Sequence, residues 1–386
     1  MQSLFPNNKV LLDGGFGTTL ESTFGLNISN TPLWSAKAVV ERPDVIVQAH
    51  LAFLHAGSDI ILTSTYQCSY ATFERAGYGI EEAKKIFIKS IELAIQARDL
   101  FYEENDTHGR QSRNIRIALS LGSFGASLVP AQEFDGFYPP PFGPKGYAST
   151  GNNYNSFEDD DQGRELERQA IGALTDFHLQ RLLILLEERR LWNMVDCIAF
   201  ETVPVLREIR AIRKAMDILT ERIASEGLES KPWWISMVFP DGKFPQVQKD
   251  NSMTSVRDVV KTVLERGGGN VSTAPPALGV NCTSIEYIPM LILEMGKAVN
   301  EIRGTSEKGC GKPWLVVYPN GGDVYDPVTQ TWKVADGDKE NKKDVWAKTL
   351  AELTSSEGYP WGGYIVGGCC RTGPEHIQVL RQTVKD

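Results

Sequence analysis

The chain of 386 residues has a formal net charge of −9, with 41% hydrophobic and 23% charged residues. This composition excludes a disordered chain, and the acidic balance argues against a nucleic-acid-binding surface, which needs a basic patch. No apolar run approaches the roughly 20 residues that cross a bilayer, and the first residues lack a secretory signal pattern. The sequence therefore predicts a cytoplasmic protein with no membrane partner, whose 6 cysteines stay reduced.

Short, continuously apolar runs recur along the chain. Such runs indicate strands that are buried on both faces, as in a parallel sheet. The candidate strands are residues 10–13, 59–65, 115–121, 197–201, 233–239, 278–282, 314–318 and 363–367. Stretches of helical period follow them, at residues 45–56, 80–103, 164–188, 205–220, 255–265, 285–299, 343–355 and 374–384. Eight β–α units that close on themselves form a (β/α)8 TIM barrel, an α/β fold. We expect one such barrel domain over residues 1–386; a doubly wound sheet is the alternative.

Three stretches interrupt this alternation. The longest, residues 129–162, follows the third strand and has too many proline and glycine residues for a helix. A loop of this length in a compact domain is usually functional or disordered. Residues 304–312 and 323–342 are interpreted as surface loops. The longest stretch is either a solvated insertion or a lid over a site, and its aromatic residues favour the lid: Phe134, Phe137, Tyr138, Phe142 and Tyr147.

Polar residues collect at the carboxyl ends of the predicted strands, where a TIM barrel places its chemistry. Asp13 precedes two glycines and could accept a hydrogen bond from a substrate ammonium group, with exposed backbone N–H groups nearby, although a plain turn explains this segment equally well. Glu201 ends an apolar strand, so its carboxylate is either paired internally or receives a cationic ligand. Thr63 ends another strand. His178, near Arg181 in a helical stretch, is expected to be structural.

The adjacent Cys369 and Cys370 follow two glycines, which is an uncommon arrangement. They are either small buried residues of a packed turn or part of a thiolate metal site. With Cys282 as the third sulfur, a tetrahedral Zn²⁺ ion would keep one open position for a substrate. Adjacent strand residues point to opposite faces, so both cysteines can bind one ion only if the chain turns sharply there. The remaining cysteines are expected to be structural or surface residues: Cys68, Cys197 and Cys310.

Seven segments together carry a resemblance to a known family. They are LDGGFGTTLE, GSDIILTSTYQ, GSFGA, IAFETVP, GVNCT, YPNGG and GGCCRTGPEHI. In this order they resemble the zinc-dependent homocysteine S-methyltransferases, and most of all the fungal and plant enzymes that use S-methylmethionine or S-adenosylmethionine. The resemblance covers nearly the whole chain, and the combination of GVNC with GGCC is its most specific part. The stretch at residues 129–162 is longer and more acidic than the family pattern.

The resemblance implies a (β/α)8 barrel with one zinc ion per chain, held by Cys282, Cys369 and Cys370. It also implies that Asp13, Gly14 and Thr63 border the homocysteine site and that Glu201 holds the amino group of that substrate. Zinc coordination would keep the homocysteine sulfur as a thiolate. This thiolate would attack the methyl group of a sulfonium donor, which Tyr66 or the aromatic residues of the loop could contact through cation–π interactions.

Two other functions remain open on the sequence. One keeps the barrel but takes the methyl group from betaine or another donor to homocysteine. The other is a non-catalytic zinc or thiol sensor, which has no need of an amino-acid pocket. We expect small-molecule substrates only, and a monomer, because the chain ends soon after the eighth unit.

Overall fold

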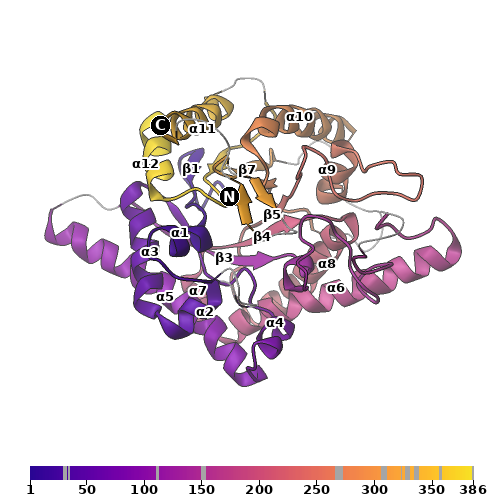
Figure 1. Ribbon diagram of the computed structural model, residues 1–386, viewed down its shortest axis with the longest axis horizontal. Helices are drawn as coiled ribbons and strands as arrows, with labels where there is room; N and C mark the ends of the chain where they lie inside the picture. The colour runs from indigo at the N-terminus through magenta and orange to yellow at the C-terminus, as the bar shows by residue number, and fades with distance from the viewer. Residues whose placement is uncertain are drawn as a thin grey trace.

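The computed structural model describes residues 1–28, 33, 35–109, 113–148, 154–265, 273–305, 311–322, 324–326, 331–333, 339–355 and 359–384. Within these residues, eight parallel strands form one sheet in the order β1–β10–β7–β6–β5–β4–β3–β2. A parallel bridge between Leu12 and Ile60 joins the two outer strands, so the sheet curls into a nearly closed barrel, with helices around it (Figure 1). The strands are β1 (Lys9–Leu11), β2 (Ile60–Leu62), β3 (Arg116–Gly122), β4 (Cys197–Val203), β5 (Trp233–Met237), β6 (Ala277–Asn281), β7 (Trp314–Tyr318) and β10 (Tyr364–Val366).

The helices cover the outside of this barrel. Those that the sequence predicts are α3 (Pro43–Ala56), α5 (Ile80–Thr107), α6 (Asp161–Glu187), α8 (Leu206–Ser225), α9 (Val256–Leu264), α10 (Ile288–Thr305), α11 (Lys339–Ser355) and α12 (Pro374–Thr383). The predicted TIM-barrel fold is therefore confirmed, with element boundaries shifted by a few residues. Short helices that the sequence did not predict are α1 (Phe16–Ser22), α2 (Ser35–Glu41), α4 (Tyr70–Arg75) and α7 (Arg189–Met194). No described helix is both long enough and apolar enough to cross a bilayer.

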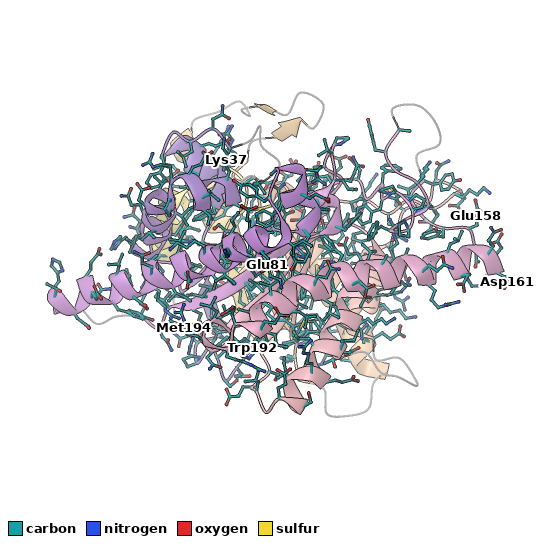
Figure 2. The ribbon with its side chains drawn as sticks, turned by 90° about the horizontal axis from the view of Figure 1, so that it is seen from below. Lys37, Glu81, Glu158, Asp161, Trp192 and Met194 are labelled. Atoms are coloured by element: carbon teal, nitrogen blue, oxygen red, sulfur yellow. A yellow bond between two sulfur atoms is a disulfide. The ribbon has the colours of Figure 1, made fainter. Side chains whose placement is uncertain are left out.

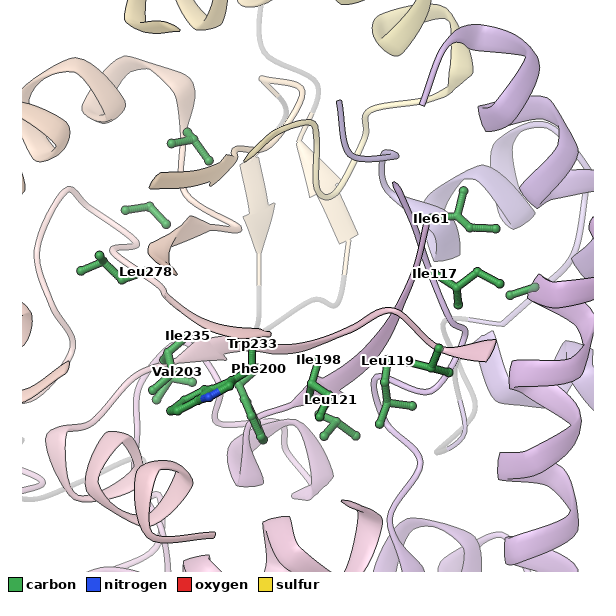
Figure 3. Close-up of a cluster of buried hydrophobic side chains, with 14 of the residues drawn as sticks. Ile61, Ile117, Leu119, Leu121, Ile198, Phe200, Val203, Trp233, Ile235 and Leu278 are labelled. Carbon is green, nitrogen blue, oxygen red and sulfur yellow. The ribbon is translucent and has the colours of Figure 1, made fainter. Parts of the chain in front are cut away.

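Alternation along each strand divides the core into two layers, because successive side chains point to opposite faces. Ile117, Leu119 and Leu121 of β3 point outward and pack with Ile198 and Phe200 of β4 under the helices (Figure 3). Each such side chain contributes about 1.5–3 kcal/mol on burial. The intervening residues point into the barrel, where apolar side chains from the amino ends of the strands form a second cluster.

Residues before β1 close the amino end of the barrel. Phe5 is buried, and its ring centroid lies 5.7 Å from that of Trp314 at the start of β7. Phe5 belongs to the same interior cluster as Cys197, the first residue of β4. This end is therefore filled with apolar side chains, and the polar residues of the strands lie at the other end.

The insertion at residues 129–162 is packed against the barrel in its described part; residues 149–153 lie outside the described residues. Tyr138 is fully buried, and Asn155 donates to the carbonyl of Pro245 at 3.1 Å. The interpretation as a solvated insertion is thus wrong for these residues. Val129 and Tyr147 are exposed within the insertion, and Figure 2 shows Glu158 and Asp161 at the outer end of α6.

The other two predicted loops are only partly described. Residues 306–310, which include Cys310, lie outside the described residues. The stretch at residues 323–342 contains a two-stranded antiparallel hairpin, β8 (Val324–Asp326) with β9 (Thr331–Lys333), and the beginning of α11. The stretch predicted as a surface loop thus contains secondary structure of its own, and the two strands of the hairpin pair with each other outside the barrel sheet.

Candidate metal centre and active site

Three cysteines meet at the carboxyl end of the barrel. The sulfur atoms of Cys282, directly after β6, and of Cys369 and Cys370, after β10, lie within 4.8 Å of one another. The sharp turn that adjacent ligands require is present: the N–H of Thr372 donates to the carbonyl of Cys369 at 3.2 Å, and Arg371 has a left-handed φ of 63°. The tertiary structure thus brings together the sulfur atoms that the sequence proposed as one metal site.

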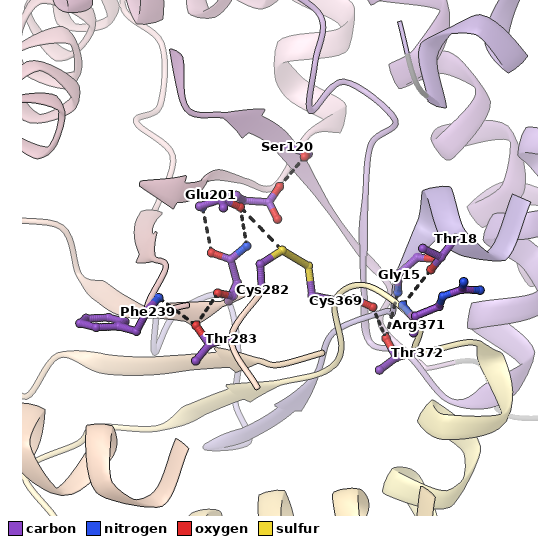
Figure 4. Close-up of a disulfide and its surroundings, with 12 residues drawn as sticks. Gly15, Thr18, Ser120, Glu201, Phe239, Cys282, Thr283, Cys369, Arg371 and Thr372 are labelled. Atoms are coloured by element: carbon purple, nitrogen blue, oxygen red, sulfur yellow. Dashed lines mark hydrogen bonds between the residues drawn. A yellow bond between two sulfur atoms is a disulfide. The ribbon is translucent and has the colours of Figure 1, made fainter. Parts of the chain in front are cut away.

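Two of these sulfur atoms are joined in the structure. Cys282 and Cys369 form a disulfide, while Cys370 is a free thiol (Figure 4). The expectation that the cysteines stay reduced concerns the compartment and remains a prediction. The fold places the two Cα atoms 5.5 Å apart, within the range that a disulfide spans. A metal ion and the disulfide use the same sulfur atoms, so the pair must be reduced before it can bind an ion.

The backbone around the cluster is strained. Thr202 at the end of β4 has a φ of 59° and Cys282 has a φ of 49°, both in the left-handed region that residues with side chains rarely adopt. Asn281 joins the two strand ends, because its Oδ1 accepts from the N–H of Thr202 at 2.8 Å and its Nδ2 donates to the Thr202 hydroxyl at 2.7 Å. This pair of hydrogen bonds fixes the direction in which Cys282 presents its sulfur.

The turn that carries Cys369 is bound to the beginning of the chain. The N–H of Gly15 donates to the hydroxyl of Thr372 at 3.0 Å, and that hydroxyl donates to the carbonyl of Cys369 at 2.5 Å. A Cβ atom on Gly15 would lie 2.3 Å from the same carbonyl oxygen, so only glycine fits there. The hydroxyl of Thr18 accepts from the N–H of Arg371 at 3.0 Å. Sequence reasoning did not identify these supporting residues, since they act through contacts between distant segments.

Asp13 lies in the same mouth of the barrel. It is fully buried; its Oδ2 accepts from the N–H of Leu62 at 2.8 Å, while its Oδ1 has no hydrogen-bond partner. Burial raises the pKa of Asp13 well above its usual value, and the nearby Glu201 carboxylate adds to this effect. The sequence had suggested exposed backbone N–H groups in this segment. The N–H of Gly15 is instead hydrogen-bonded to the hydroxyl of Thr372.

Glu201 is the second carboxylate of the mouth. It is 4% exposed, and its Oε1 accepts a hydrogen bond from the hydroxyl of Ser120. Burial raises the pKa of Glu201 to about 7, although Ser120 and the nearby phenol of Tyr318 oppose the shift. None of the ion pairs among the described residues involves Glu201. Its hydrogen-bond partner among the described residues is the hydroxyl of Ser120, which carries no charge.

Thr63 and Gly14 are brought to this mouth with structural roles of their own. The hydroxyl of Thr63, directly after β2, accepts from the N–H of Ser120 in β3 at 3.0 Å, and the hydroxyl of Ser120 in turn donates to Glu201 in β4. A Cβ atom on Gly14 would lie 2.5 Å from the carbonyl oxygen of Thr372, which explains the glycine by close packing. A contact of either residue with substrate remains a prediction.

His178 is structural, as expected, and it belongs to a buried network with Glu208, which the sequence did not single out. One carboxylate oxygen of Glu208 lies 3.0 Å from Nε2 of His178, and the other accepts from the hydroxyl of Tyr138 at 2.6 Å. Burial alone would raise the pKa of Glu208, but these hydrogen bonds hold it below its usual value. Arg181 extends the network to the carbonyl of Gly122 at 2.9 Å. The network therefore anchors the inserted loop to the end of β3.

Two of the loop aromatic residues pack against the barrel. Tyr138 is buried beside Phe124, and Phe142 stacks on the same ring with centroids 3.9 Å apart. These rings form part of a small apolar cluster against α6 and α8. Cys68 and Cys197 are buried free thiols, which agrees with the structural role predicted for them.

Comparison with known proteins identifies the family. The family model of homocysteine S-methyltransferase matches residues 10–384. The chain belongs to this family. It is 30% identical over 376 residues to homocysteine S-methyltransferase 1 of Arabidopsis thaliana, covering 97% of this chain and 93% of that relative. It is 31% identical over 374 residues to homocysteine S-methyltransferase YbgG of Bacillus subtilis, covering 96% and 93%.

A solved structure of the family is similar over the whole chain. The homocysteine methyltransferase MmuM of Escherichia coli, in its metallated form, has a TM-score of 0.61 and 26% identity, covering 97% of this chain and 96% of MmuM. MmuM has also been solved in an oxidised form, with a TM-score of 0.63. The protein described here is accordingly an enzyme of the homocysteine S-methyltransferase type, which acts on small molecules.

Proposed function

We propose that the enzyme moves a methyl group from a sulfonium donor, S-methylmethionine or S-adenosylmethionine, to the sulfur of L-homocysteine, with one Zn²⁺ ion on Cys282, Cys369 and Cys370. The observation that carries this proposal is the convergence of three sulfur atoms within 4.8 Å at the mouth that also holds two buried carboxylates. The metallated form of MmuM supports the metal part of the proposal.

The donor set fits zinc. Three cysteine sulfur atoms would leave a tetrahedral ion one open position, which is typical of catalytic rather than structural sites. Burial, with a smaller contribution from Glu133, raises the pKa of the Cys370 thiol to about 12. A bound cation is therefore what would ionise this thiol at neutral pH. When bound, zinc would also keep the homocysteine sulfur deprotonated and electron-rich.

The residues of the chain position the amino acid. The Glu201 carboxylate is near enough to Asp13 to add to the rise of its pKa, and neither carboxylate has a cationic partner among the described ion pairs. An ammonium group between them would bind to the free Oδ1 of Asp13 and the Ser120-bound carboxylate of Glu201. This contact would orient homocysteine with its sulfur toward the cysteines.

The transfer itself needs no general base from the protein. A lone pair of the homocysteine thiolate forms the new S–C bond, and the pair of the old C–S bond stays on the donor sulfur, which becomes a neutral thioether. No proton moves in this step. The protein contributes by holding the two sulfur atoms and the methyl carbon in line and by excluding water.

One experiment tests the proposal. Purified, reduced protein is assayed for zinc and for methionine formed from homocysteine with S-methylmethionine, S-adenosylmethionine or betaine. We expect one zinc per chain and activity with a sulfonium donor. Activity with betaine alone would show that the donor is not a sulfonium. Bound zinc without turnover on any donor would favour a non-catalytic zinc or thiol sensor. A cytoplasmic monomer remains our prediction, which gel filtration and localisation of a tagged chain would check.

A further inference from the structure

Strand β4 carries an extra residue at its carboxyl end. Between Phe200 and Val203 it advances three residues while the neighbouring strand β5 advances two. Such a β-bulge bends the strand and redirects its side chains, and bulges are common beside active sites. Thr202, inside the bulge, has a φ of 59°, which is rare for a β-branched residue and persists only where the surroundings require it. The fold therefore holds Thr202 in this conformation at a cost in strain.

The bulge turns two consecutive side chains toward the mouth of the barrel. Phe200 and Val203 both pack outward under the helices (Figure 3), although residues three apart in a regular strand point to opposite faces. The residues between them are Glu201, the second carboxylate of the mouth, and Thr202, which is fully buried and contacts Cys282. A regular strand would direct only one of these two neighbours to the mouth.

The hydrogen bonds of Thr202 fix the direction of its hydroxyl proton. Its backbone N–H donates to Oδ1 of Asn281 at 2.8 Å, so Nδ2 is the amide atom that faces the hydroxyl. Nδ2 can only donate, so the hydroxyl oxygen accepts at 2.7 Å and its own proton is left for another acceptor. That acceptor is Sγ of Cys282, 3.9 Å from the hydroxyl oxygen, and Figure 4 shows the hydrogen bond that ends on this sulfur.

A donor at this position complements the charge of the proposed zinc centre. Three thiolates outweigh one Zn²⁺ ion, so the centre is anionic, and a bound homocysteine thiolate adds a further negative charge. Cys282 is 8% exposed, so water solvates its sulfur poorly, and a buried charge is unfavourable unless hydrogen bonds satisfy it. A thiolate is also a stronger acceptor than a disulfide sulfur, because hydrogen bonds to ionised acceptors are shorter and about twice as strong.

We propose that Thr202 is a positioning residue for the zinc centre, whose hydroxyl donates to the Cys282 thiolate, takes up part of its negative charge and fixes its direction. This inference rests on the proposed function, because it takes zinc on the three cysteines as given. It assigns a task to a residue that the family resemblance left without one. The strained bulge then has a purpose, since it brings the hydroxyl of Thr202 to the sulfur.

The proposal predicts two changes when the hydroxyl is removed. Thr202→Val keeps the branched shape, but the anionic centre loses a stabilising hydrogen bond, so the affinity for zinc should fall about tenfold to a hundredfold. In the Co²⁺-substituted enzyme the sulfur holds its electrons less tightly without the donor. The thiolate-to-cobalt charge-transfer absorption should therefore move to longer wavelength. Thr202→Ser keeps a hydroxyl and should restore both properties.

The matched control is Thr283→Val, which makes the same change at the residue after Cys282. Thr283 is also buried, but its hydroxyl bonds to the backbone. It accepts from the N–H of Phe239 at 3.0 Å and donates to the carbonyl of Asn281 at 3.0 Å. Thr283→Val should therefore lower the free energy of unfolding and leave the charge-transfer band in place.

The experiment titrates reduced protein with Co²⁺, measures zinc affinity by competition with a chelator, and checks folding by circular dichroism. An unchanged affinity in Thr202→Val, or a fall in affinity without a shift of the band, would overturn the inference and leave the proposed function intact. A reduced wild type that binds no zinc would overturn both. Should Thr202→Val fail to fold, Thr202→Gly suits the positive φ and should show the same shift of the band.

Discussion

The two ends of the barrel are built from the same strands and have opposite character. At the amino end, Phe5, Cys197 and Trp314 pack in an apolar cluster. At the carboxyl end, Asp13 and Glu201 are as deeply buried, and Oδ1 of Asp13 has no partner. Buried polar atoms without partners are unfavourable unless a ligand supplies what is missing. The comparison teaches that burial is shared by both ends, whereas buried carboxylates and left-handed backbone mark the end with the candidate site.

The two ends of the barrel can also be compared through their cysteines. Cys197 at the amino end is a buried thiol whose pKa is raised by burial and by Asp196, and it is not among the described cysteines whose sulfur atoms gather within 4.8 Å. Cys370 at the carboxyl end is also buried enough to raise its pKa, but two further sulfur atoms lie within 4.8 Å. The number of neighbouring sulfur atoms, and not burial, distinguishes a candidate ligand from a core residue.

The largest expected effect comes from replacing each of these two cysteines by alanine in turn. Cys370→Ala should remove zinc and lower methyl transfer about a thousandfold or more, because the ion loses one of three protein ligands. Cys197→Ala should keep one zinc per chain and lower the free energy of unfolding by about 1 kcal/mol, as for a small cavity. Metal analysis, an activity assay and urea unfolding measure these outcomes. Full zinc content in Cys370→Ala would contradict the assignment of the cluster.

A smaller effect is expected at the paired carboxylates. Glu201→Gln should raise the KM for homocysteine about tenfold to a hundredfold, because a hydrogen bond to a charged group is worth about 1.5–3 kcal/mol. The zinc content and the KM for the donor should stay as in the wild type. An unchanged KM for homocysteine would show that the amino group binds elsewhere.

The pH dependence sharpens this test. Burial raises the pKa of Glu201 to about 7, so its charge is present above this pH and is lost below it. The wild type should therefore lose its advantage over Glu201→Gln in the KM for homocysteine as the pH falls from 8 to about 6. The ratio of the two KM values removes the pH dependence that comes from ionisation of the homocysteine thiol, because both enzymes share it. A ratio that is constant with pH would exclude Glu201 as the titrating group.

The smallest effect on catalysis is expected at Asn281, which touches neither sulfur nor substrate in this arrangement. Asn281→Ala leaves the buried N–H of Thr202 without its partner at 2.8 Å, which costs about 1–3 kcal/mol. Cys282 then loses its fixed direction, and zinc affinity should fall about tenfold to a hundredfold. Competition with a chelator measures this affinity. An unchanged zinc affinity would show that the cysteine cluster does not depend on the hydrogen bonds of Asn281.

Much of the fold was accessible from the sequence because each barrel strand is a short apolar run followed by a helical period. The run at Trp314–Tyr318 is the observed strand without change. The short helices α1 and α4 escaped prediction, because a segment of 6 or 7 residues has too few turns to show a period. In the site, the cysteines and carboxylates were identified by residue type at strand ends. The supporting roles of Asn281 and Thr372 were not predicted, because amide and hydroxyl groups are common everywhere.

The sequence by itself determined the alternation of strands and helices and the end of the barrel at which the candidate residues gather. These properties follow from periodicity and from the direction of parallel strands, which are local. Only the tertiary structure decided that Cys282 lies beside a turn 87 residues later and that Gly15 supports this turn. Such contacts depend on how the strands close and on how tightly two backbones approach, and no short stretch of sequence contains that information.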